Sequence, residues 1–598
     1  MTAALINFVR RCVSLSWLAG PIFDKELRVS SRRRRNYVLR FVYLAVLTVL
    51  LVLIWVEVVR YGGSAVYRTS RMGEAGKTII AFIVWFQFCA TQVVAGVMLS
   101  TSISDEIYNR TLGLLMTTPI NSFQIVMGKL FSKLLQLILL LAISLPLLAV
   151  VRVFGGVPWD YLISSLCITL ATVIFVGSLS LFFSIFTRRA YVVIIMTALT
   201  VGALFVIVPL FTTMVWQALD LRTIIPERTL ATVILHPNPY GALAFNSAMM
   251  FNPRGGTGMP VLLWPLHCGI MLAASALVLS LSVSLVRKVA LAQAAGQSDI
   301  FMRRRRSRRP ASPQTAVREE SSGPVRHING PPALWKELRA PILRRHKLAA
   351  SVIICVCLLV LCASYGLWAL EGHLDEKEVH MLYVTIFMSA GMLFTIVIPA
   401  TCITSEKESR SWPLLLATTL SDNEILFGKF MGVFRRCLPI WLFLFGHLAL
   451  FTIVGYIHPI AILQMAVLVI WLITFLSCTG LYFSSRFRHT TTAVIMNFAL
   501  AAVIWGLVPL LLFLVLNVFH ADQDLAETYM DTNPFVHALA LIDATAGSRN
   551  VGSYDWVGIG SLSVFESTCW MLFCMLAYIS VGSLFAWRAG CRLRRNIF

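Results

Sequence analysis

The chain has 598 residues, of which 58% are apolar and only 13% are charged. About a quarter of the residues of a soluble protein are charged, so this composition excludes an ordinary soluble enzyme. The net charge of +22 raises the question of a nucleic-acid partner, and the position of the charges along the chain answers it.

Twelve apolar segments are each long enough to cross a bilayer as a helix, because a hydrocarbon core of about 30 Å requires roughly 20 residues. In chain order these segments are 41–59, 79–101, 131–151, 161–186, 190–216, 261–286, 348–370, 380–402, 437–455, 460–484, 491–518 and 562–587. We therefore predict an all-α polytopic membrane protein with about 12 transmembrane helices.

Most lysines and arginines fall in the connections on one side of the predicted membrane, the side that holds both termini. Positive residues are enriched in cytoplasmic loops, so we predict that both termini are cytoplasmic. The same residues would attract anionic membrane lipid. Because topology and lipid account for the charge, we expect no nucleic-acid partner.

A polar stretch between two apolar segments recurs 300 residues later. Residues 102–129 and 402–429 agree without a gap at nine of 28 positions, and 181–209 agrees with 481–509 at eight of 29. Six spans per repeat would give both repeats the same orientation, as in parallel transporter repeats. We predict two homologous halves, 1–290 and 334–598, joined by a disordered basic linker, 291–333.

Shorter motifs recur as well. Lys25-Glu26-Leu27-Arg28 returns as Lys336-Glu337-Leu338-Arg339, and Asn238-Pro239-Tyr240 returns as Asn533-Pro534-Phe535. The first motif lies in a basic segment before the first span of each half. We predict that this segment forms a short helix in the membrane interface.

The recurring polar stretch, here called the connector, has a definite pattern in each half. Glu106 and Arg110 are four residues apart, as are Glu406 and Arg410, which allows each pair to meet on one helical face. The matching positions that follow are a breaker (Gly113, Pro413), a leucine pair (Leu114 and Leu115, Leu414 and Leu415) and a capping-box pair (Asn121 with Gln124, Ser421 with Glu424). We predict a short helix, a break, a short apolar helix, another break and a capped helix, all at the cytoplasmic surface.

An exposed Glu–Arg pair stabilises a helix by only about 0.3–0.5 kcal/mol, which is a weak reason to find it twice. Common descent from a duplicated ancestor would also leave it there, but a partner that grips both halves explains it better. The chain has no GxxxxGK[ST] motif for binding ATP phosphates. We therefore predict that the chain is not an ATPase and that no cofactor binds to it.

The order of Glu-x-x-x-Arg, Leu-Leu and Gly-Lys between the second and third of six spans resembles that in permeases of type-2 ATP-binding-cassette exporters. The segment HPNPYGAL at 236–243 resembles bacterial members of that group. The resemblance implies two six-span permease units fused in one chain, in a bacterial cytoplasmic (inner) membrane. It also implies separate cytoplasmic ATPase subunits that bind ATP and Mg²⁺, and it allows further membrane or periplasmic subunits.

The same resemblance implies roles for particular residues. Glu106, Arg110, Glu406 and Arg410 would seat in the ATPase subunits, while Leu114, Leu115, Leu414 and Leu415 would transmit force to the spans. Short helices are expected in the outer segments 217–260 and 520–560. The translocation path would run near Gln87 and Gln92, with His447 as a further candidate.

Two other classes of function stay open. Ion-gradient-driven secondary transporters also use parallel six-span halves, and His447 is a possible ionisable group within a span. The alternative interpretation of His447, Gln87 and Gln92 is bonding between neighbouring helices. A membrane anchor within a larger complex is the second alternative class.

Overall fold

The computed structural model describes residues 22–23, 25–26, 28, 34–60, 65–108, 111, 114, 117–118, 120–153, 156–187, 189–252, 262–294, 330–339, 347–519, 521–547 and 551–594. This part of the chain is almost entirely helical, which confirms the predicted all-α fold class. Eleven of its helices are long and apolar enough to cross a membrane. A twelfth, α3 (Arg34–Arg60), coincides with the predicted first span, although the apolar stretch found in it covers only Arg40–Leu53.

The helices of the N-terminal part follow one another with short connections. After α3 they are α4 (Ala65–Leu99), α5 (Ser104–Tyr108), α7 (Ser122–Val153), α8 (Trp159–Phe186), α9 (Ala190–Gly202), the π-helix η1 (Ala203–Ile207), α10 (Val208–Ala218), the 3-10 helix η2 (Leu221–Thr223), α11 (Glu227–Leu235), α12 (Pro239–Phe251) and α13 (Trp264–Ala294). The helices expected between 217 and 260 are thus present.

The C-terminal part repeats this order. Its elements are α14 (Pro332–Arg339), α15 (Lys347–Glu371), α16 (Lys377–Cys402), α17 (Thr404–Glu408), α18 (Trp412–Leu416), α19 (Asp422–Val454), α20 (Ile460–Arg486), α21 (Thr490–Ala502), the π-helix η4 (Val503–Leu507), α22 (Val508–Phe519), α23 (Asp524–Met530), α24 (Pro534–Thr545), β1 (Tyr554–Trp556), β2 (Gly560–Leu562) and α25 (Val564–Arg592). Helices α9 and α21, the two π-helices, and α13 and α25 each begin 300 residues apart.

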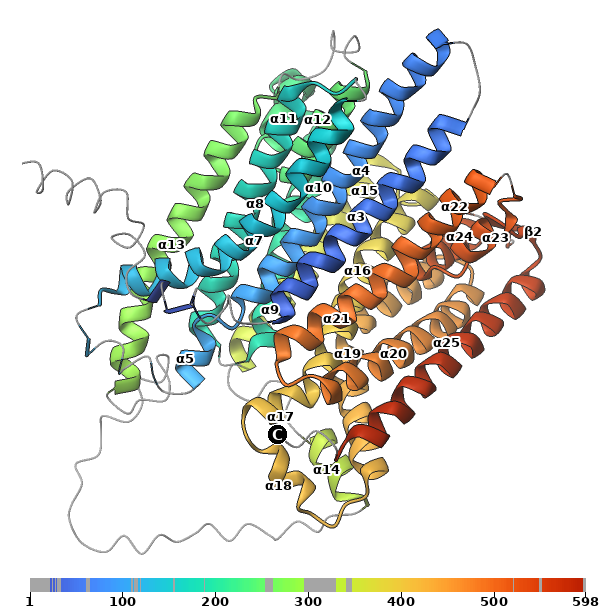
Figure 1. Ribbon diagram of the computed structural model, residues 1–598. Coiled ribbons are helices and arrows are strands. Elements are labelled where there is room, and N and C mark those ends of the chain that lie inside the picture. The colour runs from blue at the N-terminus through green and yellow to red at the C-terminus, as the bar shows by residue number, and fades with distance from the viewer. Residues whose placement is uncertain are drawn as a thin grey trace, which may run out of the picture.

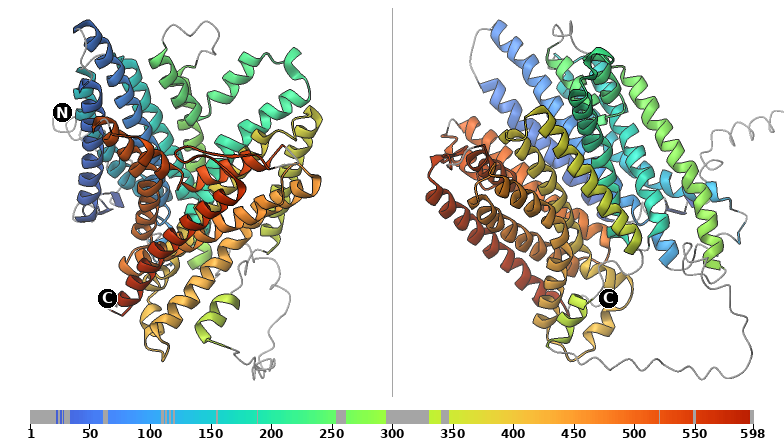
Figure 2. Two further views of the ribbon diagram at one scale, coloured as in Figure 1. Left: turned by 90° about the vertical axis from the view of Figure 1, so that its right-hand side faces the viewer. Right: turned by 180° about the vertical axis from the view of Figure 1, so that it is seen from behind.

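The two groups of helices lie side by side and exchange equivalent contacts (Figures 1 and 2). Helix α3 packs against α22, and α15 packs against α10. In the same way, α4 packs against α21, and α16 packs against α9. Reciprocal contacts of this kind are what an approximate twofold axis produces. The apolar cores also cross this boundary, since Leu514 packs with residues of the N-terminal group.

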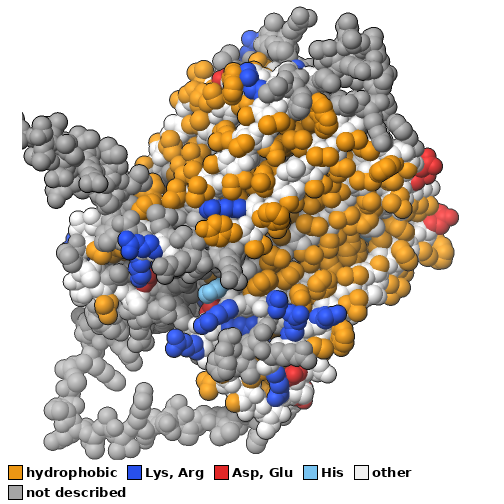
Figure 3. Space-filling view, viewed as in Figure 1, with side chains coloured by type: hydrophobic (Ala, Val, Ile, Leu, Met, Phe, Trp, Pro, Cys, Tyr) orange, Lys and Arg blue, Asp and Glu red, His pale blue; other side chains and the backbone are white. Residues whose placement is uncertain are grey.

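The polar ends of the bundle differ in content. The connector helices α5, α17 and α18 lie at one end together with α14, whereas α11, α12, α23, α24 and the β-strands lie at the other (Figure 1). A broad hydrophobic face lies between the ends, and Lys and Arg side chains gather beside the connectors (Figure 3). This arrangement is that of a multi-pass membrane protein with both connectors at the same end.

The π-helices explain why the Asn-Pro motif recurs. The side-chain N–H of Asn238 donates to the Phe205 carbonyl in η1 at 2.9 Å, and that of Asn533 donates to the Trp505 carbonyl in η4 at 3.0 Å. Each asparagine also caps the next helix, where its oxygen accepts from the main chain. A π-turn displaces the regular helical hydrogen bonds, so one side chain satisfies a freed carbonyl and begins a helix.

Replacing Asn533 with alanine is expected to lower the free energy of unfolding by about 2–3 kcal/mol, because both the cap and the bond to Trp505 are lost. Serine keeps a capping oxygen but cannot span to the Trp505 carbonyl, so Asn533→Ser should cost about half as much. Unfolding in SDS titrations measures both variants. Equal midpoints for alanine, serine and wild-type proteins would refute this role.

The sequence did not predict the β-hairpin, in which Tyr554 pairs with Leu562 and Trp556 with Gly560. Each strand has only three residues, too few to show an alternating pattern. The hairpin is held from outside, since the buried Asp531 carboxylate accepts main-chain N–H groups of Val557, Gly558 and Ile559 at 2.9, 2.9 and 3.1 Å.

Candidate functional site

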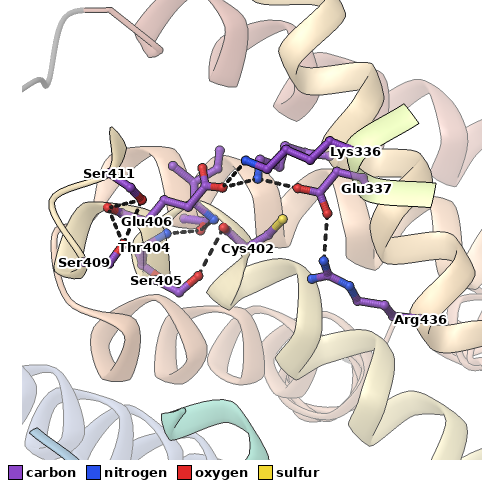
Figure 4. A network of polar contacts seen from close by, with 12 residues as sticks. Lys336, Glu337, Cys402, Thr404, Ser405, Glu406, Ser409, Ser411 and Arg436 are labelled. Atoms are coloured by element: carbon purple, nitrogen blue, oxygen red, sulfur yellow. Dashed lines mark hydrogen bonds and ion pairs between the residues drawn. The ribbon is translucent and has the colours of Figure 1, made fainter. Parts of the chain in front are cut away.

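The recurring Lys-Glu-Leu-Arg motif, which is distant in the sequence, meets both ends of the connector in space. The Lys429 ammonium on α19 lies 2.6 Å from a carboxylate oxygen of Glu337 on α14 and 2.6 Å from one of Glu406 on α17. Figure 4 labels the two glutamates and shows Arg436 bound to Glu337. In the N-terminal half, Lys129 lies 3.0 Å from Glu26 and 2.9 Å from Glu106. We call each of these two sets a Glu–Lys–Glu cluster.

Local sequence places these groups. Ser421 and Glu424 form the predicted capping box, which begins α19 and sets the register of Lys429. A Cβ on Gly428 would lie 3.0 Å from the Ala333 main chain, and one on Gly432 would lie 2.9 Å from Glu337. These glycines therefore let α14 approach α19 closely, and the neighbouring lysine binds the carboxylate that α14 brings. This is the structural meaning of the Gly-Lys pair in the second half, and in the first half Lys129 likewise binds Glu26.

The cluster is largely shielded from solvent. The side chains of Lys429 and Glu337 are 6% and 8% exposed, and Arg436 lies 2.7 Å from the second oxygen of Glu337. Burial alone would raise the pKa of Glu337, but Lys429 and Arg436 outweigh burial and lower it. Burial opposes the lysines in the same way at Glu26 and Glu106, and both pKa values are lowered. These carboxylates therefore stabilise the fold above their ordinary pKa, and the contribution is lost as the pH falls through the lowered values.

The predicted pairing of Glu406 with Arg410 is wrong. Helix α17 ends at Glu408, and Arg410 has a left-handed backbone with φ of 56°. The N–H of Ser411 donates to the Glu406 carbonyl and that of Arg410 to the Lys407 carbonyl, the pattern of a Schellman helix end. This turn leaves the Arg410 side chain exposed, while Glu406 faces Lys429.

The first connector shares one of these bonds, since the Thr111 N–H donates to the Glu106 carbonyl at 3.0 Å. Glu106 likewise bonds Lys129. Arg110 and Leu115 lie outside the described residues, so the predicted pairing of Glu106 with Arg110 stays a prediction.

The connector leucines divide into two kinds. Leu114 and Leu414 are 71% and 73% exposed, whereas Leu415 is partly buried against the main apolar core. The predicted order of short helix, break, short apolar helix, break and capped helix is confirmed in the second connector. The first break lies just before Pro413, which itself stands in the first turn of α18, where the missing N–H costs nothing. Each connector thus presents an exposed leucine and turns its glutamate inward.

The residues predicted near a translocation path lie within helix packing. Gln87 accepts a hydrogen bond from Ser144 at 2.9 Å, and Gln92 accepts one from Tyr240 at 2.8 Å. His447 is buried, and its Nδ1 lies 2.6 Å from the Tyr365 hydroxyl. These bonds join helices of the same half, and the structure does not bring the three residues together.

The sequence shows that the motifs containing these residues recur, but it predicted no role for Lys129, Lys429, Glu26 or Glu337. The signal was the recurrence of charged residues next to apolar spans, where an unpaired charge is costly. Pairing the recurring acidic residues with the recurring lysines would have found the clusters.

Comparison with known proteins adds the family. No curated protein matches the chain. The signature of the family described as ABC-2 family transporter protein matches residues 286–587, half of the chain. With its many membrane-spanning helices, the chain therefore belongs to the ABC-2 transporter family and is a membrane component of an ABC-type transporter.

Proposed function

We propose that the chain is the permease of an exporter in a bacterial inner membrane, driven by separate cytoplasmic ATPase subunits that bind ATP and Mg²⁺. Residues 1–290 and 334–598 would be two permease units fused in one chain, and the connectors would be their docking elements. The matching order of helices and the position of both connectors at one end support this proposal.

The observation that carries the proposal is the exposed face of the connector, formed by Arg410 and Leu414 in the second half. Leu414 is 73% exposed, as its counterpart Leu114 is 71% exposed. Arg410 occupies a left-handed position, where a non-glycine residue costs about 1–2 kcal/mol. A side chain kept at that cost, beside an exposed leucine, suits recognition by a partner.

The Glu–Lys–Glu cluster supplies the mechanical link behind this face. A partner that pushes on Leu414 and Arg410 would move α17, whose Glu406 is bound to Lys429 on α19. Lys429 also holds Glu337 on α14. Helices α17, α14 and α19 would then move together. Glu406, and Glu106 in the first half, would act as positioning residues and not as docking residues.

Co-purification with the ATP-binding protein encoded beside this chain tests the docking. Leu114→Asp combined with Leu414→Asp is expected to reduce the recovered ATPase at least tenfold, because two desolvated leucine contacts are each worth about 1.5–3 kcal/mol. The control is Leu291→Asp, at a leucine that is 60% exposed and lies near the end of α13, outside the connectors.

A second variant separates docking from folding. Arg410→Gly relieves the left-handed backbone, so it should raise the unfolding midpoint while it weakens ATPase recovery. Full ATPase recovery with both the aspartate pair and Arg410→Gly would refute docking at the connectors.

One observation favours a second candidate, a transporter driven by a proton gradient. His380 on α16 is fully buried, and its ring centroid lies 5.5 Å from that of His447 on α19. Ionisable groups within membrane helices often mark proton relays. Transport in liposomes under a pH gradient, without any ATPase, would establish this alternative, and no transport under either ATP or a gradient would favour a membrane anchor.

A further inference from the structure

The second connector is attached to the turn between α20 and α21 by a lysine. The Lys407 ammonium donates to the main-chain carbonyls of Ser484 and Phe487, each at 3.2 Å, and also to that of Ser485. These carbonyls lie at the C-terminal end of α20, where a helix carries partial negative charge. Lys407 thus caps α20 from α17.

Two further contacts join the same elements. The Glu408 carboxylate accepts the Thr490 main-chain N–H at 2.8 Å and the Thr490 hydroxyl at 2.6 Å. The Ser484 hydroxyl oxygen accepts the main-chain N–H groups of Ile403 and Thr404 at 2.8 and 2.9 Å. Helix α17 is therefore bonded both to the last turn of α20 and to the first residue of α21.

The first half has a different chemistry at the matching positions, 300 residues earlier. Ile107, Tyr108 and Ala190 stand where the second half has Lys407, Glu408 and Thr490. Isoleucine has no ammonium, tyrosine has no carboxylate and alanine has no hydroxyl, so these side chains cannot form the same links. The hydroxyl of Ser184, the counterpart of Ser484, donates to the Leu181 carbonyl of its own helix at 2.6 Å.

We propose that the two connectors are mechanically unequal. Lys407, Glu408 and Thr490 make α17 and α21 one body, so movement of the second connector passes directly to its fifth span, whereas the first connector lacks this link. The inference rests on the proposed function, because the force that moves the connector comes from an ATPase. The three residues are positioning residues that act through α21.

The link matters for the whole molecule because α21 lies at the contact between the two halves. Helix α21 packs against α4 and α9 of the other half, so displacement of α21 changes the contact between the halves. Of the two ATPase positions, the one at the second connector would therefore control this contact more strongly. An exporter built in this way would depend unequally on its two ATP sites.

Hydrogen exchange of the purified chain tests the link without any ATPase. The main-chain N–H groups of Thr490 and Ala190 occupy equivalent first positions of α21 and α9. We expect the protection factor at Thr490 to exceed that at Ala190 by about tenfold, the effect of one net hydrogen bond. Glu408→Ala combined with Lys407→Ile removes the oxygen that accepts the Thr490 N–H and should abolish the difference, and equal protection in the wild-type protein would overturn the proposal.

Spin labels measure the displacement of α21 relative to α9 in the complex with the ATPase. Labels at Met196 and Met496, equivalent exposed positions on α9 and α21, are introduced as genetically encoded amino acids because the chain has 13 cysteines. Trapping with ATP and vanadate should shift the distance between the labels. Thr490→Ala with Lys407→Ile should lose at least half of the shift while the ATPase stays bound, and Thr490→Ser, which keeps the hydroxyl, should retain it.

The outcomes separate the two proposals. A full shift in Thr490→Ala with Lys407→Ile overturns the mechanical inference and leaves ATPase docking intact. If no ATPase co-purifies with the wild-type chain, the proposed function fails, and hydrogen exchange alone decides whether α17 and α21 are linked.

Discussion

Replacing Lys429 with methionine is expected to lower the free energy of unfolding by about 3–5 kcal/mol, the usual cost of removing one partner from a buried ion pair. Glu337 and Glu406 would lose the ammonium that lies 2.6 Å from each of them. Two carboxylates would then face each other in a shielded site, with Arg436 still bound to Glu337 and the exposed Lys336 3.8 Å from Glu406. The unfolding midpoint in SDS titrations measures the loss.

Lys336 offers the matched control for this substitution. Its side chain is 63% exposed and lies 3.8 Å from the same Glu406, so Lys336→Met should cost at most about 1 kcal/mol. Changing Glu337 and Glu406 to glutamine should recover part of the stability lost in Lys429→Met, because it removes the unpaired charges. Equal effects of Lys429→Met and Lys336→Met would contradict the buried cluster.

The pH dependence of the free energy of unfolding provides a second measurement on the Lys429→Met protein. The pKa of Glu337 is lowered from its ordinary value of 4.5 against the effect of burial. Its contribution is therefore complete above that value and is lost as the pH falls through the lowered pKa. The difference in stability between wild-type and Lys429→Met proteins should narrow in acid.

Replacing Gly558 with alanine is expected to detach the β-hairpin from α23 and to cost about 3 kcal/mol. A Cβ at this position would lie 2.2 Å from the Thr528 nitrogen and 2.4 Å from the Glu527 carbonyl carbon. Both are main-chain atoms of a helix and cannot move aside. Displacing the turn would also break the hydrogen bonds that the Asp531 carboxylate accepts from three main-chain N–H groups of the hairpin. Limited proteolysis within 551–562 and SDS unfolding measure the effect.

Gly560 is the control for the hairpin. It has a positive φ of 82°, but an added Cβ would meet nothing within 4 Å. Gly560→Ala should therefore cost only the backbone strain, about 1–2 kcal/mol, and leave the hairpin protected from protease. If Gly558→Ala were as mild as Gly560→Ala, close packing on α23 would not hold the turn.

The membrane-spanning helices were predictable because each one satisfies its own main-chain hydrogen bonds and appears in the sequence as one long apolar segment. The connector was predictable only in outline. Its capping box depends on residues three apart, Ser421 and Glu424, and was found correctly. The pairing of Glu406 with Arg410 was wrong because spacing by four residues assumes a continuous helix, and the chain turns left-handed at Arg410.

The sequence by itself determined that this protein crosses a membrane many times, that its connector motif occurs twice, and which charged residues recur. These properties are local or periodic, so they can be read along one dimension. Only the tertiary structure decided that Glu337, Glu406 and Lys429 share one buried site and that Lys407 reaches the end of α20. Such contacts join residues up to about a hundred positions apart, and helix packing selects them, because a buried charge must find whichever opposite group or carbonyl the fold brings near.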